Sequence, residues 1–196
     1  MSLDFELVNQ SCLYSKNKLG QLKKTASPHL FLLEDFLNPL LVQKLVDFVA
    51  NDNINWKNNL YNKNAYPLSR QQLNWLPDTV VEEVHMVFSD LTLTLNSLLN
   101  KSGDFSGISI WRDTAGFGIP RHTDNPSISY AIQIYLVDGP QYLTTVFEYN
   151  DEKIQPEFKI NSGYLMDNQS KLVHYIEGAV PQDFVRYSVY AIWTLT

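Results

Sequence analysis

The chain has 196 residues and a formal net charge of −6, with 44% hydrophobic and 18% charged residues. This balance is ordinary for a water-soluble globular protein, and an acidic chain gives no reason to expect nucleic acid or an anionic membrane as a partner. Cys12 is the one cysteine, which excludes a disulfide within the chain and favours a reducing compartment. With neither a secretory signal at the N-terminus nor a run of ~20 apolar residues, a cytoplasmic protein without a membrane segment is expected.

The first part of the chain predicts peripheral elements and one helix. Residues 1–27 carry little pattern beyond a lysine patch, which favours a solvated arm or an edge strand. A short apolar run at 28–33 has the length of a strand. Asn38 and Pro39 then provide a helix cap and a first-turn proline, and apolar residues at helical spacing predict a helix over 38–51.

The segment 53–76 is rich in asparagine and aromatic residues and has no sustained period. It predicts a long loop with at most one short strand, either a substrate-covering lid or a segment whose aromatic residues simply pack on the domain. A capping box at Thr79 and a continuous apolar stripe predict a second helix over 79–100, lying against a sheet. His29 and His85 are interpreted as structural or surface residues rather than metal ligands.

After residue 103 the apolar period shortens to that of strands, which are separated by turn signals such as Asp113–Gly116 and Asn150–Glu152. The expected strands cover 107–111, 118–122, 129–137, 143–149, 157–160, 164–167, 172–176 and 186–193. Eight strands after two helices predict an α+β fold whose C-terminal half is a double-sheet jelly roll, a double-stranded β-helix. We expect a single domain over 1–196, in which residues 28–103 support a jelly-roll core formed by 104–196.

Three residues of the strand-rich half have the chemistry of metal ligands. His122 and Asp124 share a face if their segment is extended, because side chains two apart in a strand point the same way. His174 lies in an apolar strand, where a lone histidine is costly unless it is paired or bound to a metal. Two imidazoles and one carboxylate leave coordination positions open, which suits non-haem Fe(II) in oxygen chemistry.

Arg186 opens the last strand, and Ser188 shares its face. A buried arginine with a hydroxyl two residues on can anchor a carboxylate through two parallel hydrogen bonds, which predicts a chelating 2-oxo acid as cosubstrate of the iron. Each feature also has an ordinary explanation: His122 in a surface turn, His174 as a hydrogen-bonded core residue, and Arg186 in a salt bridge. Their joint occurrence in this order favours the metal interpretation.

The block Gly116–Asn125 resembles the iron-binding motif of the prolyl-hydroxylase-like 2-oxoglutarate- and Fe(II)-dependent dioxygenases. The segments Val173–His174 and Val185–Trp193 are similar to that family's distal histidine and its cosubstrate arginine strand. The opening segment His29–Leu37 and the helix after it resemble the family's N-terminal supporting region. The resemblance therefore spans residues 28–196.

The resemblance implies three iron ligands: His122, Asp124 and His174. It further implies that Arg186 pairs with the distal carboxylate of 2-oxoglutarate, with assistance from Ser188 and from Tyr135. The implied cofactors are Fe(II), 2-oxoglutarate as cosubstrate and ascorbate as an optional addition, with no catalytic side chain beyond the metal ligands. The implied reaction uses dioxygen to hydroxylate a prolyl or other amino-acid side chain, peptide-bound or free, while 2-oxoglutarate is decarboxylated to succinate.

The sequence departs from the family's pattern near the cosubstrate. Trp111 and Arg112 stand where many members carry a tyrosine, and the spacing from His174 to Arg186 is slightly long. The nucleic-acid dealkylating branch carries a second arginine six residues after the first, where this chain has Ile192. A peptide or small-molecule substrate is therefore expected rather than a nucleic acid.

Two alternatives from other functional classes stay open at this point. One is a cupin-type metal-binding protein or isomerase without 2-oxoglutarate chemistry, which would have no use for Arg186. The other is a non-catalytic binding protein on the same scaffold.

Overall fold

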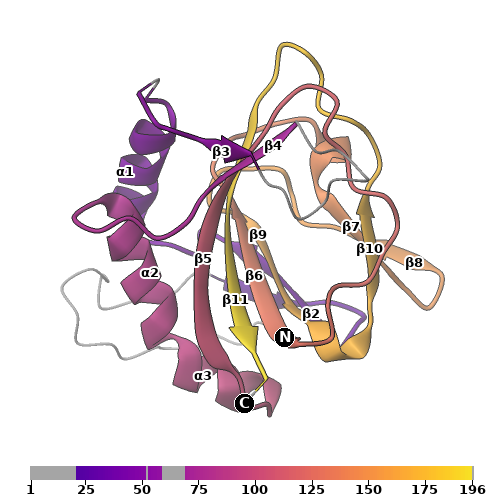
Figure 1. Cartoon of the computed structure of the whole chain (residues 1–196). Helices are drawn as coiled ribbons and strands as arrows, with labels where there is room; N and C mark the ends of the chain where they lie inside the picture. Colours follow the sequence, from indigo (N-terminus) through magenta and orange to yellow (C-terminus); the bar gives the residue numbers. More distant parts are fainter. Residues whose placement is uncertain (1–20, 52, 59–68, 196) are drawn as a thin grey trace.

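The computed structural model describes residues 21–51, 53–58 and 69–195 (Figure 1). In chain order its helices and strands are β1 (Gln21–Lys24), β2 (Leu30–Glu34), α1 (Pro39–Val49), β3 (Lys57–Asn58), β4 (Arg70–Leu73), α2 (Val80–Asp90), α3 (Thr92–Leu99), β5 (Asp104–Asp113), β6 (Ile128–Tyr135), the 3-10 helix η2 (Gln141–Leu143), β7 (Thr145–Tyr149), β8 (Glu152–Ile154), β9 (Gly163–Asp167), the 3-10 helix η3 (Asn168–Ser170), β10 (Val173–Ile176) and β11 (Arg186–Thr194).

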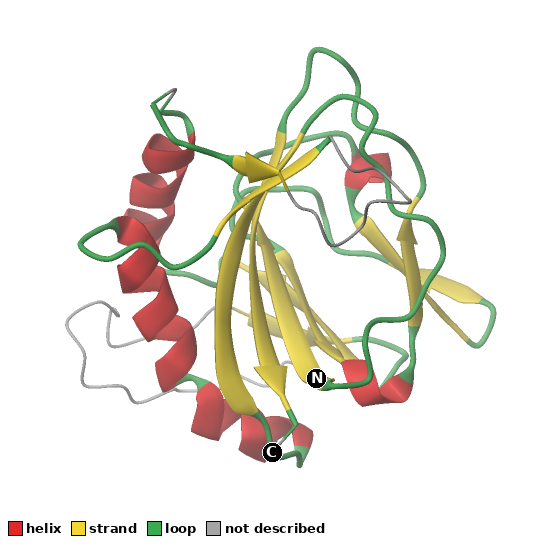
Figure 2. Cartoon of the chain, in the orientation of Figure 1, coloured by secondary structure: helices red, strands yellow, loops and turns green. Residues whose placement is uncertain are grey.

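The strands form two sheets. The larger has eight strands in the order β1-β2-β9-β6-β11-β5-β4-β3, and the smaller has the order β10-β7-β8. All strand pairs in both sheets are antiparallel. The helices α1, α2 and α3 lie together on one side of the larger sheet, and the smaller sheet lies on its other side (Figures 1 and 2). The chain is therefore an α+β protein built mostly from antiparallel sheet.

The alternation of side chains along β11 shows which face of the larger sheet carries the polar residues of the candidate site. Val189, Ala191 and Trp193 join the apolar core that the sheet shares with the helices. Because neighbouring side chains in a strand point to opposite faces, Arg186 and Ser188 face the smaller sheet instead. Both are fully buried, so the space between the two sheets holds polar groups that need partners there.

The predicted helix over 38–51 is confirmed as α1. The Asn38 Oδ1 caps it by accepting a hydrogen bond from the Leu40 N–H at 2.9 Å. The predicted single helix over 79–100 is wrong in its continuity, because α2 and α3 are separate helices that meet at Leu91. The break falls beside Thr92, whose hydroxyl accepts a hydrogen bond from the indole of buried Trp193 at 2.9 Å.

Six of the eight expected strands are confirmed: β5, β6, β7, β9, β10 and β11. The expected strand over 118–122 is wrong, since that segment makes only a single bridge, between His122 and His174. The expected strand over 157–160 is also wrong, because its backbone N–H groups bond to side chains rather than to another strand: Gln141, Ser162 and Asp138. A hairpin strand that was not expected, β8, lies at Glu152–Ile154 and begins where the expected turn over 150–152 ends.

The N-terminal arm and the lid segment are described only in part. Residues 21–24 form β1 at one edge of the larger sheet, which is one of the two alternatives expected for the arm, while residues 1–20 lie outside the described residues. Within 53–76, β3 and β4 pair as a hairpin at the other edge of the larger sheet, so the segment has two short strands rather than one. Residues 59–68 lie outside the described residues, and the lid stays a prediction.

None of the helices in the described ranges has the length and apolar character required to cross a membrane.

Candidate metal centre

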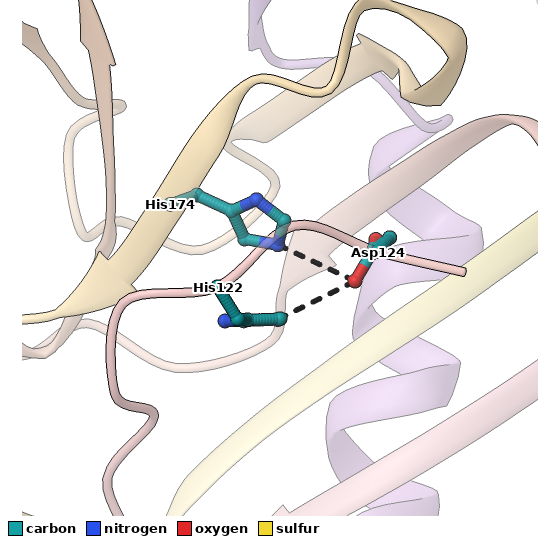
Figure 3. Close-up of side chains that lie close together, drawn as sticks. All are labelled: His122, Asp124 and His174. Carbon is teal, nitrogen blue, oxygen red and sulfur yellow. Dashed lines mark ion pairs between the residues drawn. The ribbon is translucent and has the colours of Figure 1, made fainter. Parts of the chain in front are cut away.

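His122, Asp124 and His174 converge on one point between the two sheets (Figure 3). His122 and Asp124 lie in the loop between β5 and β6, and His174 lies in β10. The Nε2 atoms of His122 and His174 lie 3.4 Å and 3.5 Å from the same Asp124 Oδ1. One ligand atom from each residue lies within 4.8 Å of the others, and no other such cluster occurs in residues 21–51, 53–58 and 69–195.

Backbone contacts orient both imidazoles. The His122 N–H donates to the His174 carbonyl at 3.1 Å, and the His174 N–H donates back at 2.9 Å. In each ring the Nδ1 atom lies beside a carbonyl oxygen, at 2.9 Å from Pro120 and 3.0 Å from Leu172. A hydrogen on Nδ1 leaves Nε2 with a free lone pair, which is the form of histidine that binds a metal.

The two oxygens of Asp124 have different surroundings. Oδ1 faces the histidines, while Oδ2 accepts hydrogen bonds from the Tyr190 hydroxyl at 3.2 Å and from the Asn168 amide at 3.4 Å. Burial raises the pKa of the Asp124 carboxyl, but the hydrogen bonds and charges of both histidines outweigh it and hold this pKa well below its usual range. Burial and the Asp124 charge raise the pKa of Tyr190 well above its usual value, so its hydroxyl keeps the proton it donates.

We expect Tyr190→Phe to weaken metal binding by ~10- to 100-fold, the usual cost of losing a partner that orients a ligand. The ring should stay in place because it stacks on Trp111 with 4.3 Å between centroids. Titration of the protein with Mn(II), followed by electron paramagnetic resonance, measures the affinity. Tyr187→Phe is the matched control, since Tyr187 is on the same strand but packs toward the helices. Equal Mn(II) affinities for the two variants would contradict this role.

Arg186 is fully buried and lies directly opposite Asp113 of β5. Its Nη1 donates to the Asp113 Oδ2, whereas its buried Nε and Nη2 have no hydrogen-bond partner among the described residues. Burial lowers the pKa of the guanidinium, but the charge and hydrogen bond of Asp113, together with the nearby Tyr135 and Tyr164, outweigh burial and raise this pKa. The salt-bridge interpretation therefore accounts for one nitrogen of Arg186, and two adjacent donors on one edge are left for a ligand.

Ser188 and Tyr135 lie beside Arg186. The two residues are directly opposite each other on β11 and β6, and both are fully buried. The Ser188 hydroxyl accepts a hydrogen bond from the Gln133 amide at 2.9 Å, and the Tyr135 hydroxyl accepts one from the Thr145 N–H at 3.0 Å. The Tyr135 ring centroid lies 5.2 Å from the guanidinium carbon of Arg186. The structure thus groups these three predicted residues, with both hydroxyls also bonded to protein.

The two residues that depart from the family pattern lie on opposite faces of β5. Trp111 stacks on Tyr190 and is on the side of the metal ligands. Arg112 points the other way, with its Nη1 bonded to Gln71 at 2.8 Å and its guanidinium 6.0 Å from the Trp56 ring. Of the two, only Trp111 is on the face of β5 that packs against Tyr190, a hydrogen-bond partner of Asp124.

The remaining described histidines lie apart from the metal cluster. The Nδ1 of His29 lies 3.2 Å from an oxygen of Asp167, and the ring of His85 packs edge-on against Trp75 and Phe105. These contacts agree with their interpretation as structural residues.

Tyr190, Asn168, Asp113 and Arg70 contribute to the site but were not predicted. Tyr190 has a usable signal, because it is four residues after Arg186 and therefore on the same face of the strand. Asp113 was interpreted as a turn residue, although it is the buried last residue of β5. Asn168 and Arg70 reach the site only through tertiary structure, and no local pattern identifies them.

Comparison with solved structures shows which proteins share this arrangement of sheets and helices. A prolyl-4-hydroxylase from Pseudomonas putida superposes with a TM-score of 0.66 at 15% identity, over 86% of this chain and 94% of that chain. A prolyl hydroxylase from Trichoplax adhaerens, in complex with a hypoxia inducible factor peptide fragment, superposes with a TM-score of 0.62 at 13% identity, over 85% of this chain and 83% of that chain. HygX from Streptomyces hygroscopicus, with nickel, 2-oxoglutarate and hygromycin B bound, superposes with a TM-score of 0.62 at 8% identity, over 86% of this chain and 83% of that chain.

No family model matches the sequence, and no curated protein matches it. The structural likeness extends over most of this chain and most of each neighbour. The chain therefore has the fold of prolyl-4-hydroxylases and other 2-oxoglutarate- and Fe(II)-dependent oxygenases.

Proposed function

We propose that this protein is an Fe(II)- and 2-oxoglutarate-dependent dioxygenase that hydroxylates a prolyl or other amino-acid side chain, in a peptide or free. The observation that carries the proposal is a His-Asp-His cluster in the same space as a buried arginine with two unpaired donors. We infer that the two sheets are the two walls of a single jelly-roll domain, with this space as its interior.

The residues fit both groups that the reaction needs. Two imidazole Nε2 atoms and one carboxylate oxygen are a donor set typical of non-haem Fe(II). The unpaired Nε and Nη2 of Arg186 lie on the edge of a guanidinium that binds a carboxylate through two parallel bonds. An unpaired buried donor is costly, and a carboxylate ligand would satisfy both at once.

The charges at the arginine also suit an acidic cosubstrate. Arg70 and Arg186 face one carboxylate, Asp113, so this buried group carries one formal positive charge in excess. The distal carboxylate of 2-oxoglutarate would balance that charge. A neutral ligand would leave it uncompensated in a region that is closed to solvent.

Each residue then has a task in the proposed reaction. His122, Asp124 and His174 would hold the iron, and Arg186 would fix the far end of 2-oxoglutarate so that its 2-oxo acid end points to the metal. Bound iron supplies the activation of dioxygen that couples decarboxylation of 2-oxoglutarate to hydroxylation. Tyr135 and Ser188 are buried beside Arg186, and they would line the cosubstrate end and exclude water from it.

Two lines of support favour an amino-acid side chain as the substrate. Two of the three solved structures described above are prolyl hydroxylases, and one of these is in complex with a peptide fragment. The chain also carries a net charge of −6, whereas nucleic-acid binding requires several cations around the site. Incubation with peptides, free amino acids and oligonucleotides, followed by succinate assay and mass spectrometry, tests the choice. A product one oxygen atom heavier from an oligonucleotide alone would overturn it.

The proposal predicts a visible charge-transfer band when 2-oxoglutarate is titrated into the anaerobic Fe(II) protein. The band requires the 2-oxo acid to chelate the iron, so it should saturate with 2-oxoglutarate and be absent with succinate. Absorption spectroscopy under nitrogen measures it. Iron binding without the band would favour a cupin-type metal protein, and failure to bind iron at all would favour a non-catalytic binding protein.

A further inference from the structure

Strand register aligns three charged residues across the wall of the site. Arg70 on β4, Asp113 on β5 and Arg186 on β11 occupy directly opposite positions on three neighbouring strands. Residues opposite each other in antiparallel strands point to the same face, so their side chains meet. Side-chain exposure is 12% for Arg70 and 0% for both Asp113 and Arg186, which makes this a buried group.

The carboxylate of Asp113 is shared unequally between the two arginines. Arg70 donates its Nε to Oδ1 at 2.6 Å and its Nη2 to Oδ2 at 2.9 Å, which is a two-bond pair. Arg186 donates only its Nη1 to Oδ2. Asp113 is therefore directed mainly at Arg70, and the Nε and Nη2 of Arg186 have no hydrogen-bond partner among the described residues.

Aromatic rings fix the position of Arg70. Its guanidinium carbon lies 3.8 Å from the centre of the Trp111 ring and 4.1 Å from that of Phe117. Contacts of a guanidinium with aromatic faces are favourable, more so where water is excluded. The orientation of Arg70 is thus set by packing as well as by its pair with Asp113.

We propose that Arg70 is a positioning residue for the cosubstrate anchor: by pairing with Asp113, it prevents that carboxylate from occupying the edge of Arg186 that binds the ligand. The inference rests on the proposed function, because the ligand in question is the distal carboxylate of 2-oxoglutarate. Without Arg70, Asp113 is the nearest anion to Arg186 and becomes its competing partner. Loss of Arg70 also removes the excess positive charge, so both effects weaken carboxylate binding.

A double-mutant cycle on Arg70 and Asp113 tests this arrangement. The affinity for 2-oxoglutarate is measured anaerobically by calorimetry on the Mn(II)-loaded protein, so that no turnover is needed. We expect Arg70→Gln to weaken 2-oxoglutarate binding by ~10-fold or more, as for disruption of a buried charge pair. Adding Asp113→Asn to Arg70→Gln removes the competing carboxylate and restores the formal excess charge, so affinity should return to within ~3-fold of the original.

Two further variants keep the test decisive. Arg70→Lys retains the charge but lacks the planar two-donor fork, so it should weaken 2-oxoglutarate binding by less than Arg70→Gln does. Arg112→Gln is the matched control, because it removes an arginine from β5 that points to the other face. It should leave the affinity unchanged, and the Mn(II) affinity should be the same in all variants.

The outcomes separate this inference from the proposed function. If Arg70→Gln binds 2-oxoglutarate as well as the unaltered protein does, the inference is wrong and the proposed function stands. If the double variant binds as weakly as Arg70→Gln, Arg70 acts through a direct or general structural effect, and the inference is again wrong. If the unaltered Mn(II) protein does not bind 2-oxoglutarate, the proposed function fails and the inference fails with it.

Discussion

Asp124→Ala is expected to abolish Fe(II) binding and all metal-dependent turnover while leaving a folded domain. The substitution removes the one oxygen ligand, on which the Nε2 atoms of His122 and His174 both converge. Loss of a residue that merely orients a ligand costs ~10- to 100-fold in affinity, and loss of the ligand itself should exceed that range. The fold should survive because Asp124 lies in a loop and contributes nothing to the apolar core.

Metal content after anaerobic reconstitution, measured by mass spectrometry of the desalted protein, checks this result beside a circular dichroism spectrum. His29→Ala and His85→Ala are the matched controls, since both histidines lie outside the metal cluster among the described residues. They should retain stoichiometric iron. Retention of stoichiometric iron by Asp124→Ala would show that the metal assignment is wrong.

His122, Asp124 and His174 do cluster, but through a local structure that differs from the expected one. Strand alternation predicted that His122 and Asp124 project together, but their segment is a loop with only one bridge to a strand. The convergence comes from the backbone pair between His122 and His174, two residues 52 positions apart in the sequence. Motif and spacing identified the residues, whereas only tertiary pairing determines how they meet.

The residues around the cluster, such as Asp113 and Asn168, were not predicted, and the reason is that their partners are distant in the sequence. Asp113 begins a run of turn-forming residues, and local propensity therefore assigned it to a turn. A buried carboxylate at a strand end is stable only with partners, and those partners are Arg70, 43 residues earlier, and Arg186, 73 residues later. Asn168 likewise reaches Asp124 from a short 3-10 helix 44 residues later in the sequence. No local pattern contains that information.

The same distinction explains the secondary-structure results. The helix at α1 and the strand at β11 have both a clear apolar period and clear end signals, and their positions were predicted closely. Residues 157–160 have strand-like composition, but side chains of neighbouring loops take up their backbone N–H groups. Periodicity identifies which face of a segment is apolar, and it does not identify the partner of each backbone group.

Arg186→Lys is expected to raise the apparent KM for 2-oxoglutarate by ~10- to 100-fold, because hydrogen bonds to charged groups contribute roughly 1.5–3 kcal/mol. Lysine keeps the positive charge but has a single ammonium group in place of the planar fork. In this site the ammonium would also face Asp113, which already bonds Arg186 from the opposite strand. The substituted side chain would therefore be drawn toward the protein's own carboxylate rather than toward the ligand.

Succinate production at varied 2-oxoglutarate, together with the anaerobic charge-transfer titration, measures this effect in two independent ways. Iron content should stay near normal, because Arg186 is not in the metal cluster. Arg112→Lys is the matched control: it makes the same chemical change one residue from Asp113, on a side chain that points away from the metal. An unchanged KM in Arg186→Lys would mean that the carboxylate is bound elsewhere or that the cosubstrate is not 2-oxoglutarate. If the KM for 2-oxoglutarate rises in Arg186→Lys but not in Arg112→Lys, and both variants keep a normal iron content, the cosubstrate carboxylate binds at the unpaired edge of the Arg186 guanidinium.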